Sequence, residues 1–352
     1  MVIQVFVFFA AVALVSGGSL KPEERISIDV AEDAKLDTAG LITKYGYPNE
    51  VHTITTEDDY ILTMHRIPHL QGQDPQQDRP VVFLMHGLLS SSADWVNMGP
   101  GSGFGYLLAD EGFDVWMGNA RGNTYSRKHA TLDPDKDSKF WKFSWNEIGY
   151  YDLPAMIDYI LAKTGKTQLH YSGHSQGTTS FFVMCALRKE YNAKIKSMHA
   201  LAPIAYMSHL RSPLVKLLSP IANTAETMLP IMLAHTPAGS SSRQMVHYGQ
   251  EHESAKFRKY DFGSVLNLVE YGKLNPPDYE LKDVTAPVTL HYAVNDWMAE
   301  PVDVLQLYGE LGNADGMYKI NHPSFNHLDF LWAIDVRSLV YDNVIRLMKG
   351  KE

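Results

Sequence analysis

Cysteine is nearly absent from this sequence, since Cys185 is the only one in 352 residues. A single cysteine allows neither a disulfide within the chain nor a zinc site built from cysteines. Positive charge is also scarce, because 31 lysines and arginines face 40 acidic residues and leave a formal net charge of -9. No run is dense in lysine or arginine, so we expect no basic surface for phosphate backbones and no nucleic-acid partner.

Long apolar runs are scarce as well, and the one that matters lies at the N-terminus. MVIQVFVFFAAVALVSGGSL has about a dozen apolar residues followed by small ones, which is typical of a secretory signal peptide cleaved near Gly18. This run is shorter than a membrane span requires. The later stretch 214–233 is interrupted by Pro220 and Pro230. We therefore expect a signal peptide over residues 1–18, no transmembrane segment, and a secreted or lumenal protein.

The rest of the chain has the composition of a globular protein with a large core. Hydrophobic residues make up 45% of the sequence and charged residues 20%. Apolar runs of strand type alternate with segments of helical periodicity, which predicts a mostly parallel sheet with helices on both faces. We expect strands within 50–68, 79–87, 113–119, 168–173, 195–203, 286–296 and 316–320, and helices within 104–112, 146–165, 178–190, 301–312 and 327–348.

Residues 206–283 interrupt this alternation. They are rich in proline, serine, histidine and lysine, contain no clear strand, and lie between two expected strands of the sheet. We interpret them as an insertion over the edge of the sheet. The expected organisation is a core formed by residues 19–205 and 284–352, which carries one cap at 206–283.

The pattern GHSQG at residues 173–177 contains the most informative serine of the sequence. Ser175 is either a nucleophile or a hydroxyl that caps the helix behind it. G-x-S-x-G between a strand and a helix is typical of the sharp turn that exposes a nucleophilic serine. The two glycines are needed because side chains at their positions would collide in so tight a turn. An apolar strand precedes this pattern and a helix follows it, so we predict that Ser175 is a nucleophile.

A nucleophilic serine needs a base held by an acid, and in this kind of turn the acid and then the base follow it along the chain. Asp296 ends an expected strand, where parallel strands present functional groups. His327 lies in the loop before the last expected helix. We predict Asp296 as the acid and His327 as the base, with Asp303 and His322 as their rivals.

Acyl transfer also requires hydrogen-bond donors for the oxyanion. We assign one donor to the backbone N–H of Gln176, directly after the serine, and the second to the N–H of Leu88. Leu88 follows the expected strand that ends in VVFLMHG. His86 in that stretch precedes Ser175, so we interpret it as a structural histidine rather than a base.

Cofactor motifs do not fit the remaining residues. The glycine-rich stretch at 99–105 matches neither the dinucleotide fingerprint nor a phosphate-binding loop with its lysine. H-E-x-x-H does not occur, and His322 with His327 has no further ligand residues nearby in the sequence. We therefore expect no metal and no organic cofactor.

Several longer motifs give the chain a family resemblance. They are HGLL at 86–89, DVWMGNARGNTYS at 114–126, FSWNEIGYYDLPAMIDYI at 143–160, GHSQGTT from 173, NDWMAEP at 295–301 and NHLDFLWAID at 326–335. Together they resemble the acid lipases, the gastric and lysosomal lipase family of α/β-hydrolases. The resemblance implies an α/β-hydrolase fold, a secreted or lysosomal protein, and a cofactor-free lipase for neutral lipids such as triacylglycerols or sterol esters. It implies Ser175, Asp296 and His327 as the catalytic triad and Leu88 with Gln176 as the oxyanion donors.

The cap departs from this resemblance, because the stretch after residue 220 is several tens of residues shorter than the family pattern implies. Glu300 in NDWMAEP also stands where the family usually has aspartate. Two other functions therefore stay open. A short cap without a long apolar groove favours an esterase for short soluble esters. The third possibility is a lipid carrier that retains the fold without catalysis.

Overall fold

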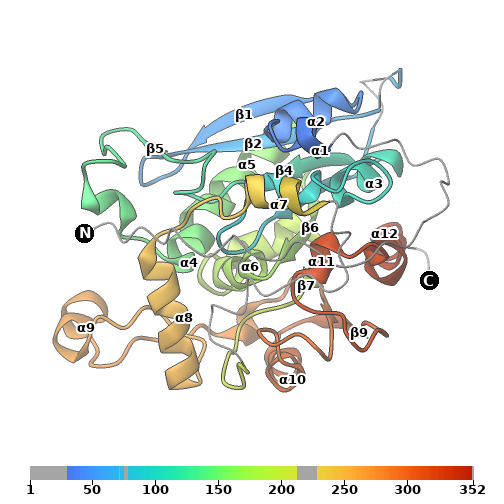
Figure 1. Ribbon diagram of the computed structural model, residues 1–352. Helices are drawn as coiled ribbons and strands as arrows, with labels where there is room; N and C mark the ends of the chain where they lie inside the picture. Colours follow the sequence, from blue (N-terminus) through green and yellow to red (C-terminus); the bar gives the residue numbers. More distant parts are fainter. Residues whose placement is uncertain (1–29, 71, 75–77, 212–227, 351–352) are drawn as a thin grey trace, which may run out of the picture.

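The structure, a computed structural model, describes residues 30–70, 72–74, 78–211 and 228–350. The expected signal peptide over residues 1–18 lies outside the described residues. A nine-stranded sheet lies at the centre of the molecule (Figure 1), in the order β1-β2-β4-β3-β6-β7-β8-β9 with β5 paired to β2. This arrangement is the α/β-hydrolase fold that the alternating pattern and the family motifs predict.

One end of the sheet is antiparallel. The strands β1 (Glu50–Thr55) and β2 (Tyr60–Ile67) form a hairpin across the acidic turn at Glu57–Asp59, as expected. Asp59 has a positive φ of 68° in this turn, a conformation that aspartate tolerates better than most residues. The two-residue strand β5 (Lys128–His129) pairs with β2 and was not expected from the sequence.

The six other strands are parallel. Their carboxyl ends meet at one edge of the sheet, because Met85 pairs with Gly173 and His174 pairs with Leu201. Functional groups in such sheets gather at this edge. The strands are β3 (Val81–Met85), β4 (Asp114–Met117), β6 (Leu169–His174), β7 (Ile195–Leu201), β8 (Val288–Tyr292) and β9 (Ala314–Lys319).

Helices cover both faces of the sheet. In Figure 1, α3 and α12 lie on one side, and α5 and α6 lie on the other. The α-helices are α1 (Val30–Asp33), α2 (Thr38–Lys44), α3 (Phe104–Asp110), α4 (Trp145–Glu147), α5 (Leu153–Thr164), α6 (Gln176–Leu187), α7 (Leu229–His235), α8 (Ser242–Ser254), α9 (Ser264–Tyr271), α10 (Pro301–Glu310), α11 (Asp329–Trp332) and α12 (Asp342–Met348). Short 3-10 helices are η1 (Ser92–Trp95), η2 (Ser138–Trp141), η4 (Lys189–Lys194) and η7 (Leu281–Asp283).

Two expected helices differ from the prediction. The segment expected as one helix over 146–165 contains a π-helical turn, η3 (Ile148–Asp152), directly before Pro154 at the start of α5. The terminal pattern over 327–348 is divided into α11, the π-helical turn η8 (Arg337–Tyr341) and α12. The division lets the two halves pack against different partners, since Phe330 meets Phe325 and Tyr341 stacks on Phe104.

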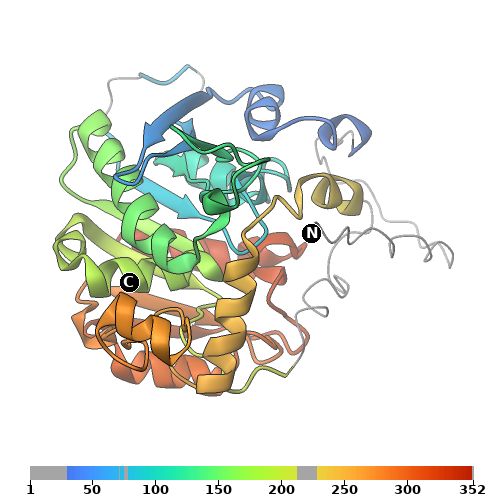
Figure 2. The same ribbon diagram turned by 90° about the vertical axis from the view of Figure 1, so that its left-hand side faces the viewer.

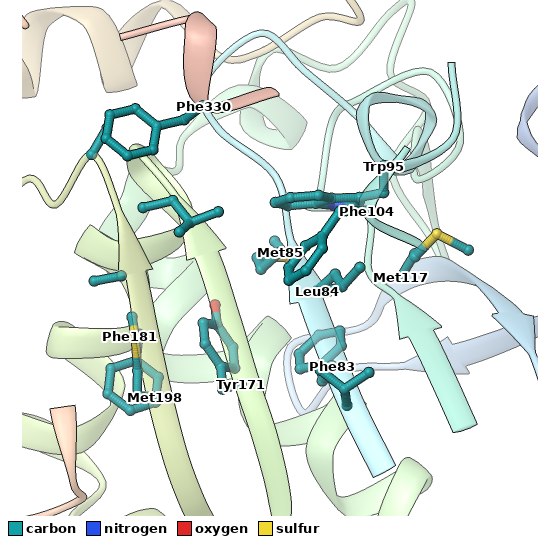
Figure 3. Close-up of a cluster of buried hydrophobic side chains, with 14 of the residues drawn as sticks. Phe83, Leu84, Met85, Trp95, Phe104, Met117, Tyr171, Phe181, Met198 and Phe330 are labelled. Atoms are coloured by element: carbon teal, nitrogen blue, oxygen red, sulfur yellow. The ribbon is translucent and has the colours of Figure 1, made fainter. Parts of the chain in front are cut away.

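The core lies on both sides of β3 and β6. All five residues of β3 are buried, which explains their uninterrupted apolar sequence. Figure 3 shows Phe83 of β3 beside Tyr171 of β6, with their ring centroids 5.5 Å apart. Tyr171 also meets Phe181 of α6 at 4.8 Å. Cys185 of α6 is fully buried, as expected for a small apolar side chain in this helix.

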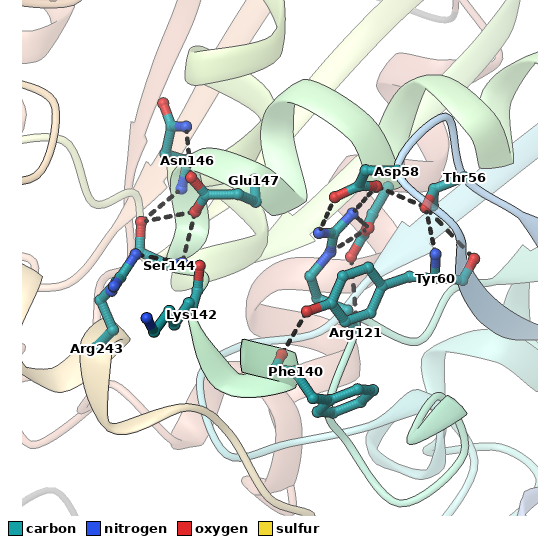
Figure 4. Close-up of polar contacts among 11 residues, drawn as sticks. Thr56, Asp58, Tyr60, Arg121, Phe140, Lys142, Ser144, Asn146, Glu147 and Arg243 are labelled. Atoms are coloured by element: carbon teal, nitrogen blue, oxygen red, sulfur yellow. Dashed lines mark hydrogen bonds and ion pairs between the residues drawn. The ribbon is translucent and has the colours of Figure 1, made fainter. Parts of the chain in front are cut away.

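A buried arginine joins the hairpin to the helix layer, as Figure 4 shows. The Arg121 guanidinium forms hydrogen bonds to both carboxylate oxygens of Asp58, at 2.6 and 2.8 Å, and to Asp152 at 2.8 Å. It lies over the ring of Tyr60 at 3.9 Å. Burial raises the pKa of Asp152 to about 6, although the positive charge of Arg121 opposes this increase.

The described part of residues 206–283 contains α7, α8 and α9. Helix α8 packs on the core through His247, whose ring stacks on Trp145 with the centroids 3.8 Å apart. Figure 2 shows α8 and α9 along one flank of the sheet. Within the residues that the structure describes, no helix has the length and apolar character needed to cross a bilayer.

Candidate active site

Ser175 lies in the turn between β6 and α6, with a φ of 51° and a ψ of -118°. A positive φ strains any residue other than glycine, and such strain is typical of the turn that carries a nucleophilic serine. Ser175 occupies the N-cap position of α6, yet its hydroxyl makes no capping hydrogen bond. Its carbonyl accepts the N–H of Thr178 at 2.8 Å instead. The hydroxyl therefore does not cap the helix, which was the alternative to a nucleophile.

The two glycines of GHSQG make room in different directions. A Cβ atom on Gly173 would lie 2.8 Å from the backbone carbonyl carbon of Gly177, so a side chain at position 173 would collide with the turn itself. A Cβ atom on Gly177 would lie 2.3 Å from the carbonyl oxygen of Met85, at the end of β3. The second glycine therefore lets the first turn of α6 press against the neighbouring strand, beyond the role expected from the turn alone.

Asp296 lies in the segment 293–300 between β8 and α10, which we name the acid loop. It is the fourth residue after the end of β8, so the expectation that it ends the strand was wrong. The reason is a turn in which the Asp296 Oδ1 accepts the N–H groups of Met298 and Ala299, both at 2.9 Å. This turn places the Asp296 carboxylate fully inside the protein.

His327 meets Asp296 across 31 residues of sequence. Its Nδ1 donates to both carboxylate oxygens of Asp296, at 2.8 and 3.0 Å. Burial by itself would raise the pKa of Asp296, but His327 and the N–H groups of Ala299 and Met298 hold it below its usual value. Since an ionised carboxylate only accepts hydrogen bonds, the proton of the imidazole resides on Nδ1. The Nε2 atom then carries the lone pair that a general base needs.

His174, the residue before Ser175, joins His327 to the serine turn. Its Nε2 donates to the carbonyl oxygen of His327 at 2.9 Å, and the two imidazole rings lie 4.9 Å apart. Burial lowers the pKa of His174 to about 3, and the neighbouring His327 adds to this effect. His174 is therefore neutral at physiological pH. His327 Nε2 is buried and has no hydrogen-bond partner among the described residues, so it is available for a substrate-bound or serine proton.

The loop after β3, residues 86–91, passes directly over the serine turn, and we name it the oxyanion loop. A Cβ atom on Gly87 would lie 3.3 Å from the Cβ atom of Ser175. Leu89 has a positive φ of 62°, which turns the chain after Leu88. Within the described residues, the N–H groups of Leu88 and Gln176 donate no hydrogen bond. Both remain available to an oxyanion at the serine.

The rival residues have other partners. Asp303 lies in α10 and accepts hydrogen bonds from His209. His322 lies in the same loop as His327, but its Nδ1 contacts the hydroxyl of Ser324 at 3.3 Å. His86 accepts the N–H of Ala120 at 3.0 Å through its Nε2, which fits the structural role expected for it. Of the two candidate acids and two candidate bases, only Asp296 and His327 are joined to each other by hydrogen bonds within the described residues.

Two contacts at the site were not expected from the sequence. One is the hydrogen bond of His174, because the variable position of G-x-S-x-G gives no signal of its own partner. The other joins the oxyanion loop to the segment between α7 and α8, where the N–H of Ala238 donates to the Leu89 carbonyl at 2.6 Å. For a metal ion, no group of three or more His, Cys, Asp or Glu side chains lies suitably close in the part of the chain that the structure describes.

Comparison with known proteins places this geometry in a family. Two family models match the chain, "Partial alpha/beta-hydrolase lipase region" over residues 38–99 and "alpha/beta hydrolase fold" over residues 80–333. The second match contains the oxyanion loop, the serine turn, the acid loop and His327.

Curated relatives match over nearly the whole chain. "Lipase 1" of Drosophila melanogaster is 44% identical over 372 residues, covering 93% of this chain and 83% of that protein. "Gastric triacylglycerol lipase" of Bos taurus is 36% identical, covering 90% of this chain and 92% of the relative. "Lysosomal acid lipase/cholesteryl ester hydrolase" of Homo sapiens is 35% identical, covering 91% and 92%.

Among solved structures, the carboxylesterase CesB from Bacillus subtilis superimposes with a TM-score of 0.55 at 12% sequence identity. The match covers 92% of this chain and 98% of CesB, and at this identity it supports the fold alone. The family models and the curated relatives agree with the motifs in the sequence. The chain therefore belongs to the acid lipase family of α/β-hydrolases and is a carboxylic ester hydrolase.

Proposed function

We propose that this protein is a lipase that hydrolyses ester bonds of neutral lipids through an acyl-enzyme on Ser175. One observation carries the proposal. The Asp296 and His327 side chains, 31 residues apart in sequence, are hydrogen-bonded to each other, and His174 ties the backbone of His327 to the strained serine turn. A histidine with a free Nε2, linked through His174 to the turn of an uncapped serine hydroxyl, supports activation of the serine for acyl transfer.

In the reaction, His327 Nε2 removes the proton of the Ser175 hydroxyl as its oxygen attacks the ester carbonyl. Asp296 stabilises the imidazolium that forms and keeps its Nδ1 proton in place. The N–H groups of Leu88 and Gln176 donate to the oxyanion, and the start of α6 adds the positive end of its dipole. His327 then protonates the leaving alcohol. A water molecule, deprotonated by the same nitrogen, attacks the acyl-enzyme; the acyl–oxygen bond breaks, His327 returns the proton to Ser175, and the fatty acid is released.

For the substrate, we propose triacylglycerols or sterol esters. The names of the relatives support these two classes, since they include a gastric triacylglycerol lipase and a lysosomal cholesteryl ester hydrolase. The same names, with the apolar N-terminal run, support secretion or delivery to the lysosomal lumen. The insertion at 206–283 is proposed as a shortened cap. In its favour, the alignment with Lipase 1 runs over 372 residues, more than the 352 of this chain.

The test is replacement of Ser175 by alanine. We expect Ser175→Ala to abolish hydrolysis of triolein and of cholesteryl oleate emulsions, and to abolish labelling by a fluorophosphonate, with an unchanged melting temperature. Ser180→Ala is the matched control, because Ser180 is also buried in α6 and its hydroxyl has no hydrogen-bond partner among the described residues. Retained turnover in Ser175→Ala would refute the assignment.

A short-chain esterase is the second candidate, because a short cap offers less apolar surface to a long acyl chain. It predicts full turnover of a soluble butyrate ester and none of emulsified triolein. The third candidate, a non-catalytic lipid carrier, predicts that the wild-type protein resists the fluorophosphonate and hydrolyses neither substrate. One panel of substrates with one labelling experiment therefore separates all three functions.

A further inference from the structure

The insertion at 206–283 contacts the acid loop at the point where the insertion begins. Residues 207–211, which we name the entry segment, leave the core and run beside the acid loop and the start of α10. The N–H of Arg211 donates to the carbonyl of Trp297 at 3.3 Å. Arg211 Nε also forms an ion pair with Glu300 Oε1 at 2.7 Å. The Asp303 carboxylate accepts two hydrogen bonds from His209, one from the backbone N–H at 3.0 Å and one from the ring Nδ1 at 2.7 Å.

These contacts join exposed hydrogen-bond donors to buried carboxyl groups. The side chains of His209 and Arg211 are 53% and 62% exposed, whereas those of Glu300 and Asp303 are both only 2% exposed. Burying a carboxylate is costly unless it is paired. Glu251 of α8 adds a further buried carboxyl group, whose pKa is raised by burial and by the charge of Asp303. The entry segment therefore supplies hydrogen-bond donors, and the positive charge of Arg211, to a part of the fold crowded with acidic side chains.

The pairing lies next to the catalytic acid along the chain. Asp296 owes its position to the N–H groups of Met298 and Ala299, and Glu300 follows immediately. Trp297, whose carbonyl accepts from Arg211, lies in the same turn. A displacement of Trp297 or Glu300 would thus move the donors that hold the Asp296 carboxylate against His327.

We propose that Arg211 and His209 are positioning residues, which hold the acid loop through Glu300 and Asp303 and so keep Asp296 aligned with His327. The proposal rests on the catalytic roles proposed above for Asp296 and His327. A later part of the insertion meets the site in a comparable way, since the Ala238 N–H donates to the Leu89 carbonyl of the oxyanion loop and the Ala238 carbonyl accepts the Thr124 N–H. The start of the insertion thereby contributes to catalysis through the geometry of the acid, without contact to substrate.

Arg211→Met and Glu300→Gln test this proposal in the full-length chain, with a soluble butyrate ester as the substrate. We expect each variant to lower kcat by about tenfold to a hundredfold with KM nearly unchanged, the size expected when a remote support shifts reacting groups by about 1 Å. The rate of fluorophosphonate labelling, corrected for the folded fraction, should fall in parallel, because a displaced Asp296 no longer orients the His327 imidazole. Arg211→Lys should recover part of the loss.

The double variant of Arg211→Met with Glu300→Gln should be no slower than either single variant, because both changes break one interaction. Arg337→Met is the matched control, since Arg337 forms an exposed ion pair with Asp342 at 3.3 Å in η8 and α12. It should leave kcat and the labelling rate unchanged.

Two results would overturn the proposal. One is an unchanged kcat in both single variants. The other is a loss of activity that matches the loss of folded protein by circular dichroism, with kcat per folded molecule unchanged, which indicates a structural role alone. Fluorophosphonate labelling of the wild-type protein distinguishes these failures from a failure of the proposed function. An unlabelled wild type refutes the catalytic roles, whereas a labelled wild type with unaffected variants refutes only the positioning role.

Discussion

Replacing Asp296 with asparagine is the sharpest test of the proposed mechanism, because the change keeps the shape of the side chain and removes its negative charge. The asparagine Oδ1 can still accept the N–H groups of Met298 and Ala299, which hold the aspartate at 2.9 Å. Its amide nitrogen would face His327 Nδ1, where the carboxylate now accepts a hydrogen bond at 2.8 Å. Two donors cannot share that contact. The imidazole proton is therefore expected to move to Nε2.

This change of tautomer removes the lone pair that accepts the Ser175 proton. We expect Asp296→Asn to lower kcat about 10⁴-fold, which corresponds to about 5 kcal/mol of activation free energy. The loss should be in kcat rather than KM, because the acid does not contact the substrate. The melting temperature should change little, since two of the hydrogen bonds to the side chain persist and the buried charge disappears.

The assay is initial-rate hydrolysis of a soluble butyrate ester, with the rate of fluorophosphonate labelling as a second readout and thermal melting as the check on folding. Asp135→Asn is the control, because Asp135 pairs with Arg127 on the surface, where its side chain is 69% exposed. A loss below about tenfold in a folded Asp296→Asn protein would contradict the tautomer argument, because that is far less than the loss of the base implies.

Three further predictions follow from other parts of the fold. Gly177→Ala would place a Cβ atom 2.3 Å from the Met85 carbonyl oxygen, so we expect about 1–3 kcal/mol of destabilisation in urea unfolding and a reduced kcat. Gly249→Ala is the control and should not destabilise the protein, because no atom of the described residues lies near the added Cβ position. Arg121→Met leaves Asp58 and the fully buried Asp152 without their cation, so we expect about 3–5 kcal/mol lower stability at neutral pH, against little change for the exposed Arg127→Met. Burial lowers the pKa of His291 to about 3, below its usual value of about 6.5. Its contribution to the free energy of unfolding is therefore complete above about pH 6.5 and falls by about 1.4 kcal/mol per pH unit as the pH drops toward the pKa of the folded state. His291→Gln should remove about one proton from the uptake on unfolding at pH 5.5, and an unchanged pH slope of the unfolding free energy would contradict this.

Much of the fold could be predicted from the sequence because its signals are local. The uninterrupted apolar run of β3 reflects burial on both faces, and Gly165 ends α5 in a left-handed conformation with a φ of 71°. The helices α1 and α2 were not expected, since their few apolar residues give no clear helical period. The break between α11 and α12 was also missed. It depends on Phe330 and Tyr341 packing against different neighbours, which periodicity along one segment does not encode.

The candidate site shows the same division between local and distant information. Ser175 is marked in the sequence by its own glycines, because the strain of the turn restricts the residues around it. Asp296 and His327 were chosen over Asp303 and His322 from chain order and element ends alone. The structure brings the preferred pair within hydrogen-bonding distance and gives Asp303 a different partner, His209.

The sequence by itself determined the class of fold, the family and the candidate nucleophile, because each depends on short patterns whose physical cause lies within a few residues. Only the tertiary structure decided that the Ser175 hydroxyl leaves the helix uncapped, that Gly177 faces the end of β3, and which nitrogen of His327 carries the proton. It also brought Arg211 of the insertion to Glu300 of the acid loop. These features depend on contacts between residues that are distant in sequence, and such contacts exist only once the sheet has brought its strand ends together.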